Sequence, residues 1–222
     1  MIGDNSHTLE NYLKAVYKLS EKSSGTVTTN EIAAALNTRP SSANDMIRKL
    51  SAKKYTRHQK YKGVVITDKG VKAALKVIRK HRLWELFLVK VLNFRWDEVH
   101  IIAEQLEHVA SDELINRLDQ FLGFPKFDPH GDPIPDHNGK IQKVPLKALS
   151  ELKIGEGGII NGVVDHSEQF LRYLEKFSLN IGNKVTVVDI IAYDRSLQLK
   201  IKNNQMIQVS SNVADNLLIK IS

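Results

Sequence analysis

The chain has 222 residues, no cysteine and a formal net charge of +7, with 42% hydrophobic and 26% charged residues. This composition is typical of a soluble globular protein with one large domain or roughly two to three smaller ones. The absence of cysteine excludes disulfides, thiolate zinc sites, cysteine-ligated iron–sulfur clusters and cysteine nucleophiles.

The positive charge is concentrated in the first third of the chain. Residues 1–73 hold 13 Lys and Arg against 6 Asp and Glu, residues 74–143 hold 10 against 11, and residues 144–222 hold 9 against 8. A basic segment beside neutral ones predicts a polyanionic partner, most often nucleic acid. The alternative is a charge excess that serves only to keep the protein in solution.

The sequence contains no sign of membrane insertion or export. No apolar run approaches the roughly 18 residues of a membrane-spanning helix. The stretch MIGDNSHTLENYLK lacks the basic start and apolar run of a signal peptide. We therefore expect a cytoplasmic protein.

The first elements in chain order are two helices. Apolar residues at helical spacing predict a helix over residues 8–22, which the stretch SSGTVT ends. Thr28 and Glu31 have the spacing of a capping box, so a second helix is expected to begin near residue 29.

A third helix and a hairpin follow. Pro40 suits the first position of a helix over residues 40–55. Residues 55–70 predict a short basic hairpin that turns at Lys62-Gly63. Helix, short helix, tight turn, helix and hairpin together indicate a winged helix-turn-helix, although many helical domains contain such a turn.

In this arrangement the third helix enters the major groove of DNA. Asn is suited to reading adenine, whereas Ser, Arg and Lys mostly hold phosphates. The predicted DNA-binding residues are Thr28, Arg39, Pro40, Ser41, Ser42, Asn44, Arg48 and Lys49, and in the wing Lys60 and Lys62 beside Arg57 and His58.

Histidine and glutamate gather on predicted helices of the middle third. The stretch HIIAEQLEHVASDE, residues 100–113, places His100, Glu104, Glu107 and His108 within about 100° of one helical face. In the long helix predicted over residues 68–92, His81 and Glu85 are four residues apart. One such face is typical of a solvated polar surface, but two that meet across a bundle would form a metal site.

The candidate ligands are oxygen and imidazole nitrogen, without sulfur. This set favours harder ions such as Mn²⁺ or Fe²⁺, and allows Zn²⁺, Co²⁺ or Ni²⁺ to substitute in vitro. A metal-dependent hydrolase is the enzyme alternative. However, the zinc-protease pattern His-Glu-x-x-His fails at the first residue of EQLEH, and no Gly-x-Ser-x-Gly or phosphate-binding loop is present. We therefore expect no enzyme.

The last third of the chain has the sequence pattern of a loop followed by short strands. Residues 124–145 hold most of the prolines and read as a structured loop. The runs VTVVDIIAY, SLQLKIK and QMIQVS predict short strands, preceded by a short helix in SEQFLRYLEKF. We expect a small, strongly curved β-barrel.

Taken together, these motifs resemble the diphtheria-toxin-repressor family of iron- and manganese-dependent transcriptional regulators, in its manganese-sensing branch with a third domain. The resemblance runs through LENYLKAVYKL, PSSANDMIRKL, GVVITDKG, RKHRLWE, VHIIAEQLEHVASDE, DPHGDPIP and LSELKIGEGGIINGVV. It implies an α+β multidomain fold. The expected domains are a winged helix-turn-helix over residues 1–73, an all-α metal-binding and dimerisation domain over residues 74–143, and an SH3-like (FeoA-type) small β-barrel over residues 144–222.

The resemblance also implies two metal sites. The first falls on Asn11, Glu104, Glu107 and His108. The second falls either on His81, Glu85 and His100, or on Glu85, Asp128, His130 and Asp165. Asn11 departs from the aspartate common in manganese-type members, and Asp128 replaces the usual cysteine with a harder ligand. His7 and His137 match no ligand and are expected at the surface.

The function implied is that of a homodimeric repressor of metal-uptake genes that binds a palindromic operator. Metal at the first site would bridge the DNA-binding and dimerisation domains and favour one spacing of the two recognition helices. Besides the metal-dependent hydrolase, the other alternative is an architectural DNA-binding protein whose binding does not depend on metal. The third domain has either a ligand-donating or a dimer-stabilising role, or both.

Overall fold

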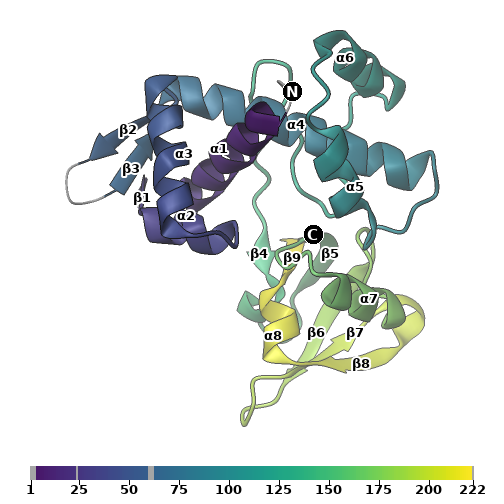
Figure 1. The fold of residues 1–222 in the computed structure, drawn as a ribbon. Coiled ribbons are helices and arrows are strands. Elements are labelled where there is room, and N and C mark those ends of the chain that lie inside the picture. Colours follow the sequence, from purple (N-terminus) through teal and green to yellow (C-terminus); the bar gives the residue numbers. More distant parts are fainter. Residues whose placement is uncertain (1–3, 24, 60–62, 222) are drawn as a thin grey trace. The chain divides into compact units, whose positions relative to one another are not determined.

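A computed structural model of the chain describes residues 4–23, 25–59 and 63–221 (Figure 1). The chain forms two compact units. The first contains residues 1–81, 104–117 and 135–141, and the second contains residues 82–103, 118–134 and 142–222. Within the described ranges, no helix has the length and apolar character needed to cross a membrane.

The first unit contains the predicted winged helix-turn-helix (Figure 1). Its strands form one antiparallel sheet in the order β1-β3-β2. The elements are α1 (Asp4–Lys22), β1 (Thr26–Val27), α2 (Thr29–Ala35), α3 (Pro40–Ala52), β2 (Thr56–Gln59) and β3 (Gly63–Ile66). The turn of the hairpin, with Lys60 and Lys62, lies outside the described residues.

Local sequence signals explain where these helices begin. Thr28 accepts a hydrogen bond from the backbone N–H of Glu31, and the Glu31 carboxylate accepts one from the Thr28 N–H, which is the predicted capping box. Pro40 occupies the first turn of α3, where its missing N–H costs no hydrogen bond. Apolar residues of α1 to α3 and of the sheet then form one core, which includes Val16, Ile32 and Leu50.

Three helices make up the middle of the chain. They are α4 (Asp68–Lys90), α5 (Val99–Leu106) and α6 (Asp112–Phe121). The boundary between the two units falls within α4, after His81. The helical face predicted to run from His100 to His108 was too long, because α5 ends at Leu106. The next helix, predicted in SDELINRLDQFLG from Ser111, is α6. Ser111 caps α6 by accepting a hydrogen bond from the Leu114 N–H.

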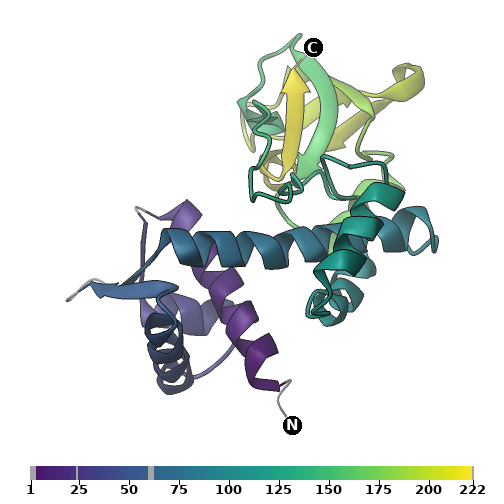
Figure 2. The same ribbon diagram turned by 90° about the horizontal axis from the view of Figure 1, so that it is seen from above.

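The C-terminal part of the second unit is the predicted β-rich domain. Six antiparallel strands pair in the order β4-β9-β5-β6-β7-β8, and the long strands β5 and β9 lie side by side (Figure 2). They are β4 (Lys147–Ala148), β5 (Gly157–Val163), β6 (Lys184–Ile190), β7 (Leu197–Lys200), β8 (Met206–Val209) and β9 (Leu217–Ile221). Irregular register in β5 and β6 adds curvature, as predicted for a strongly curved sheet.

Helices complete this domain. The predicted helix in SEQFLRYLEKF is α7 (Glu168–Lys176), which Ser167 caps. The short helix α8 (Ser211–Asp215) and the 3-10 turns η1 (Leu149–Glu151) and η2 (Lys202–Asn204) had no counterpart in the sequence prediction. The core of the domain comes from both strands and helices and includes Leu149, Ile160, Leu174, Val187 and Leu217.

A buried aspartate links the helical part of the second unit to this domain. Asp97 lies in the turn before α5, and its carboxylate accepts hydrogen bonds from Arg95 Nε at 3.0 Å and from Arg172 Nε of α7 at 2.9 Å. Its side chain is fully buried. Burial alone would raise the pKa of Asp97, but the two guanidinium groups hold it below its ordinary value.

Replacing Asp97 by asparagine should therefore lower the free energy of unfolding at pH 7 by about 1 kcal/mol, since the two guanidinium groups are half exposed and screened by water. The folded pKa lies below the unfolded one, so this stability is present above the unfolded pKa and is lost as pH falls through the folded pKa. Urea unfolding at pH 7 and at about pH 3 measures the effect. An equal loss at both pH values would contradict it; Asp215→Asn, at an exposed position of α8, is the control.

Candidate nucleic-acid interface and metal centre

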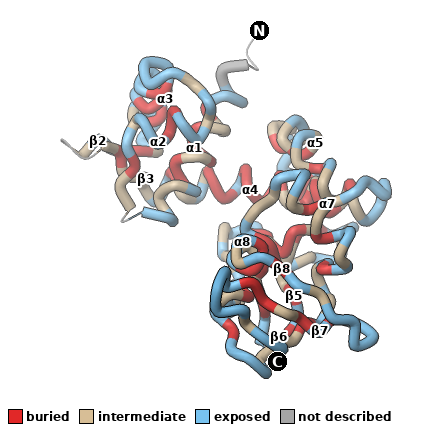
Figure 3. The backbone as a smooth tube through the Cα atoms, turned by 90° about the horizontal axis from the view of Figure 1, so that it is seen from below, coloured by how far each residue is buried: buried red, intermediate tan, exposed pale blue. Residues whose placement is uncertain are grey.

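The exposed face of α3 carries the predicted DNA-binding residues. Buried positions alternate with exposed ones along this helix (Figure 3). Ala43, Met46, Ile47 and Leu50 face the core. The exposed positions are Arg39, Pro40, Ser41, Ser42, Asn44, Asp45, Arg48, Lys49 and Ala52. The helix thus presents a polar and basic surface, as a recognition helix does.

The other predicted DNA-binding residues differ in setting. Thr28 is exposed, but its side chain is engaged in the cap of α2. Arg57 and His58 are exposed on β2, the first strand of the wing. The remaining two, Lys60 and Lys62, lie outside the described residues. The assignment of all these residues to DNA binding stays a prediction.

Replacing Arg48 by alanine should weaken DNA binding at every sequence and reduce the slope of log affinity against log salt by about 1, because one phosphate contact is lost. Fluorescence anisotropy on a promoter fragment at several salt concentrations measures both effects. Lys153→Ala removes the same charge from an exposed position in the C-terminal domain and serves as the control. An unchanged slope in Arg48→Ala would contradict the placement of α3 on DNA.

Residues predicted for the first metal site lie in the first unit, around a buried carboxylate. Glu107 follows the end of α5 and is fully buried. Its Oε1 and Oε2 lie 2.6 and 2.9 Å from Lys14 Nζ, and its Oε2 lies 2.6 Å from His81 Nδ1. Burial alone would raise the pKa of Glu107, but the hydrogen bond from His81 and the charge of Lys14 hold it below its ordinary value.

These contacts explain why α5 ends before Glu107. A fully buried carboxylate needs partners, and Glu107 finds them on α1 and α4. The chain turns after Leu106, whose carbonyl accepts a hydrogen bond from the Val109 N–H, and Lys80 Nζ donates to the Val109 carbonyl. Glu107 and His108 therefore do not continue the helical face of His100 and Glu104.

The other two predicted ligands of this site have different surroundings. Asn11 Oδ1 is buried and has no hydrogen-bond partner. The Nδ1 of His108 lies 2.6 Å from Oε2 of Glu10, and its ring stacks on the exposed ring of His7 at 4.4 Å. Glu10 and Lys14 were missed by the sequence prediction, because on a basic amphipathic helix both read as solvent-facing residues.

A second cluster lies wholly within the second unit. The ligand atoms of Glu85, Asp128 and His130 lie within 4.8 Å of one another, and all three residues are buried. Glu85 comes from α4, and the other two come from the proline-rich loop. The Nδ1 of His130 lies 3.7 Å from Oε2 of Glu85. This set matches one of the two versions predicted for the second metal site.

The surroundings of this cluster hold two of its side chains in place. His130 Nε2 lies 2.8 Å from the carbonyl oxygen of Trp96, and His130 Nδ1 is buried without a hydrogen-bond partner. Oδ1 of Asp128 accepts hydrogen bonds from the backbone N–H groups of His130 and Asp132. Arg82 Nε lies 3.6 Å from its Oδ2.

The charges of this cluster are strongly coupled. Burial, together with the negative charges of Asp132 and Glu85, raises the pKa of Asp128 to about 7. Burial would lower the pKa of His130, but the carboxylates of Glu85 and Asp128 raise it to about 9. Two buried carboxylates close together repel each other and favour a cation between them. A divalent ion meets that need, and Nδ1 of His130, which has no hydrogen-bond partner, offers it a nitrogen ligand.

The loop is also anchored to the C-terminal domain. The carbonyl oxygen of His130 accepts a hydrogen bond from the Val163 N–H of β5 at 3.1 Å. Gly131 has φ +85°, and a Cβ at this position would lie 1.9 Å from the carbonyl oxygen of Asn161. Only glycine fits there. The cluster therefore connects α4, the loop and β5.

Asp165 and His166 follow β5, and Asp165 was predicted as a ligand of the second metal site. Asp165 is half-buried, and its Oδ1 accepts a hydrogen bond from the Ser167 N–H. Among the described residues, Asp165 does not join the group of Glu85, Asp128 and His130. His166 instead stacks on the His130 ring at 4.9 Å, and burial lowers its pKa. No sequence motif had pointed to His166.

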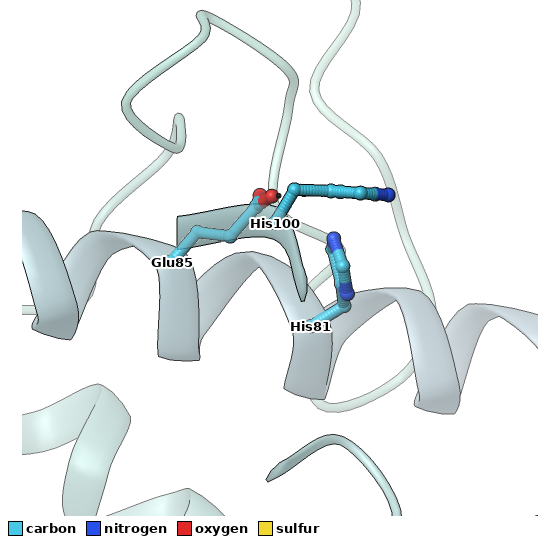
Figure 4. Close-up of side chains that lie close together, drawn as sticks. All are labelled: His81, Glu85 and His100. Atoms are coloured by element: carbon cyan, nitrogen blue, oxygen red, sulfur yellow. Dashed lines mark hydrogen bonds and ion pairs between the residues drawn. The ribbon is translucent and has the colours of Figure 1, made fainter. Parts of the chain in front are cut away.

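Glu85 also has a neighbour on α5. The Nδ1 of His100 lies 3.3 Å from Oε1 of Glu85 (Figure 4), and His81 precedes Glu85 by one turn of the same helix. His100 is half-buried, so this side of Glu85 is more open to water than the side of Asp128 and His130. Of the remaining histidines, His137 is exposed, as predicted.

Three family matches cover most of the chain. Residues 4–64 match the family described as "Iron dependent repressor, N-terminal DNA binding domain". Residues 67–136 match "Iron dependent repressor, metal binding and dimerisation domain", and residues 147–221 match the FeoA domain.

Individual relatives agree. The chain is 33% identical over 117 residues to an uncharacterized HTH-type transcriptional regulator of Methanocaldococcus jannaschii, covering 53% of this chain and 94% of the relative. It is 34% identical over 128 residues to the iron-dependent repressor IdeR of Mycobacterium tuberculosis, covering 58% of this chain and 55% of IdeR, about half of that protein. A manganese-dependent transcriptional repressor solved with manganese is 34% identical, with a TM-score of 0.86 over 96% of this chain and 100% of that chain.

The winged helix, the buried ligand cluster and these matches together define the class as metal-dependent transcriptional repressors. The chain belongs to the iron-dependent repressor family and carries a FeoA domain as its third domain. The family that the sequence motifs resembled is thereby confirmed.

Proposed function

We propose that the chain is a cytoplasmic homodimer that represses metal-uptake genes by binding a palindromic operator when Mn²⁺ or Fe²⁺ is abundant. The observation that carries the metal assignment is the buried cluster of Glu85, Asp128 and His130, in which Nδ1 of His130 has no hydrogen-bond partner. Two carboxylates and an imidazole without sulfur suit Mn²⁺ or Fe²⁺, and also accept Zn²⁺, Co²⁺ or Ni²⁺. When bound, the ion supplies positive charge that relieves the repulsion between the two carboxylates.

The residues around the cluster hold its ligands ready. With Nε2–H donating to the Trp96 carbonyl, His130 keeps Nδ1 on the side of Glu85, and a bound ion would displace the proton of Nδ1. The backbone N–H groups of His130 and Asp132 fix one oxygen of Asp128 and leave the other toward Arg82. Little rearrangement is then needed to bind an ion.

The helix α4 offers a route from this cluster to DNA. It carries Glu85 in its second half and begins at Asp68, directly after the wing strand β3. An ion that ties Glu85 to the loop and β5 favours one arrangement of α4 over others. A differential of about 1–3 kcal/mol would change DNA affinity roughly 5–150-fold.

Dimerisation is proposed through apolar residues that the second unit leaves exposed. Ile101 is 70% exposed, Phe121 67% and Phe124 59%. Large exposed apolar side chains of this kind fit a second copy of the chain. Two copies of α3 would then read half-sites separated by about 10 base pairs or a multiple of that distance.

Binding to the promoter of the cell's own metal-uptake genes tests this proposal. DNA affinity is measured with EDTA and then with Mn²⁺, Fe²⁺ and Zn²⁺ in turn. We expect tight binding only with metal, and the steepest response with Mn²⁺ or Fe²⁺. Equal binding with EDTA and with metal would contradict the proposal and favour an architectural DNA binder. Turnover of a phosphate or ester substrate by the metal-loaded protein would favour the hydrolase alternative.

A further inference from the structure

A lysine side chain lies among the carboxylates that were predicted to hold the first metal ion. Lys14 Nζ contacts both oxygens of Glu107, at 2.6 and 2.9 Å, and lies 3.5 Å from Oε1 of Glu104. Lys14 is only 8% exposed, and Glu107 is fully buried. A cation of the protein itself therefore already holds the central carboxylate of this site.

The other contacts of the site point the same way. His81 Nδ1 also contacts Glu107, at 2.6 Å from its Oε2. His108 Nδ1 faces Glu10 at 2.6 Å. The Nε2 of the same ring lies 3.8 Å from Oε1 of Glu107. Among the described residues, however, Glu104, Glu107 and His108 do not form a group of ligand atoms that all lie within 4.8 Å of one another. Three of the four predicted ligands, Glu104, Glu107 and His108, thus contact partners inside the protein. The fourth, Asn11, has no hydrogen-bond partner at Oδ1.

Charge also disfavours a divalent ion here. The predicted site has two carboxylates, and the neutral Asn11 adds no charge. Lys14 already balances one of the two carboxylate charges. A divalent ion next to the ammonium group would meet like-charge repulsion in a buried setting, where water screens it weakly. The donor set and its surroundings therefore do not fit a metal ion while Lys14 is in this position.

We propose that Lys14 is a resident cation that closes the site of Asn11, Glu104, Glu107 and His108 to divalent ions. Each chain then binds one regulatory ion, at Glu85, Asp128 and His130, instead of two. Only this count rests on the function proposed above; the placement of Lys14 does not.

With this assignment, the Lys14–Glu107 ion pair attaches the winged helix-turn-helix to the turn after α5. Lys14 belongs to α1 of the winged helix-turn-helix, and Glu107 belongs to the turn after α5. The ion pair joins these two segments of the first unit, and the His108–Glu10 contact joins them a second time. The attachment that was predicted to need metal is then permanent, and metal control passes to the other cluster.

The competing possibility is that Lys14 leaves when metal arrives. A cavity of about 510 Å³ beside it is lined by Asn11, Lys14, Lys18 and Glu104, among others, so there is room for its side chain to move. A test must therefore count the ions bound and locate Lys14 with metal present.

Electron paramagnetic resonance of full-length protein titrated with Mn²⁺ gives the count. We expect one ion per chain in wild type and in Glu104→Gln, none in Asp128→Asn, and a second ion in Lys14→Gln. Glu104 is half-buried, so its variant should fold. Two ions in wild type and one in Glu104→Gln would overturn the inference. So would a well-folded Lys14→Gln variant that still binds a single ion.

Acetylation of native lysines, read residue by residue by mass spectrometry, locates Lys14 independently. We expect Lys14 to stay protected with and without Mn²⁺, while the exposed Lys18, one turn later, reacts in both states. Acetylation of Lys14 that rises with Mn²⁺ would overturn the inference. If wild type bound no Mn²⁺ at all, the proposed metal response would fail, and protection of Lys14 would still support its pairing with Glu107.

Discussion

Asp128→Asn is expected to abolish the response of DNA binding to Mn²⁺ and to weaken Mn²⁺ binding at least about 10–100-fold, the loss typical of removing even an outer partner of a metal ligand. Asp128 is buried, and its side chain lies with those of Glu85 and His130. Asparagine retains an oxygen that can accept the backbone hydrogen bonds of His130 and Asp132, but it removes the negative charge. The fold should therefore survive while the ion loses a charged ligand.

Isothermal titration with Mn²⁺ and anisotropy on operator DNA measure this pair of effects. Asp215→Asn makes the same change of charge at an exposed position of α8 and should behave like wild type in both assays. If Asp128→Asn kept wild-type Mn²⁺ affinity and wild-type coupling to DNA, the metal response would have to come from other residues.

Glu107→Ala should lower the free energy of unfolding by about 3–5 kcal/mol, because it leaves the buried ammonium of Lys14 without its main partner. Glu107 is fully buried and bonded to Lys14 and to His81. The double variant Lys14→Met/Glu107→Leu removes both charges together. It should recover most of the loss, since apolar residues of similar volume replace buried ion pairs at little cost.

Urea unfolding in the presence of EDTA measures these stabilities without any contribution from metal. Glu113→Ala, which breaks an exposed ion pair with Arg117 on α6, should change stability by less than about 0.5 kcal/mol. A loss for Glu107→Ala no larger than that of Glu113→Ala would show that the buried pair contributes little.

Much of the fold follows from short-range signals in the sequence. The capping box of Thr28 and Glu31 and the proline at position 40 set the starts of α2 and α3, and both act through neighbouring residues. The apolar spacing of α1 and the runs of the β-rich domain act locally as well. These elements were predicted correctly for that reason. The short α8 was not, because it lacks the length to show a helical period.

The candidate site was predictable only in part. Its residue types and spacing pointed to metal, and the buried cluster of Glu85, Asp128 and His130 contains three residues from the predicted set. The end of α5 depends on Glu107 pairing with a lysine 93 positions earlier in the chain. No local pattern carries that information. On the sequence alone, Lys14 belonged to the basic charge of the DNA-binding third.

The proposed function requires that metal binding and DNA binding are coupled in this chain. The affinity of wild type for Mn²⁺, measured with and without saturating operator DNA, reveals this coupling, because a coupling free energy is reciprocal. We expect operator DNA to tighten Mn²⁺ binding by the same factor, roughly 5–150-fold, by which Mn²⁺ tightens DNA binding. The same Mn²⁺ affinity with and without DNA would contradict it.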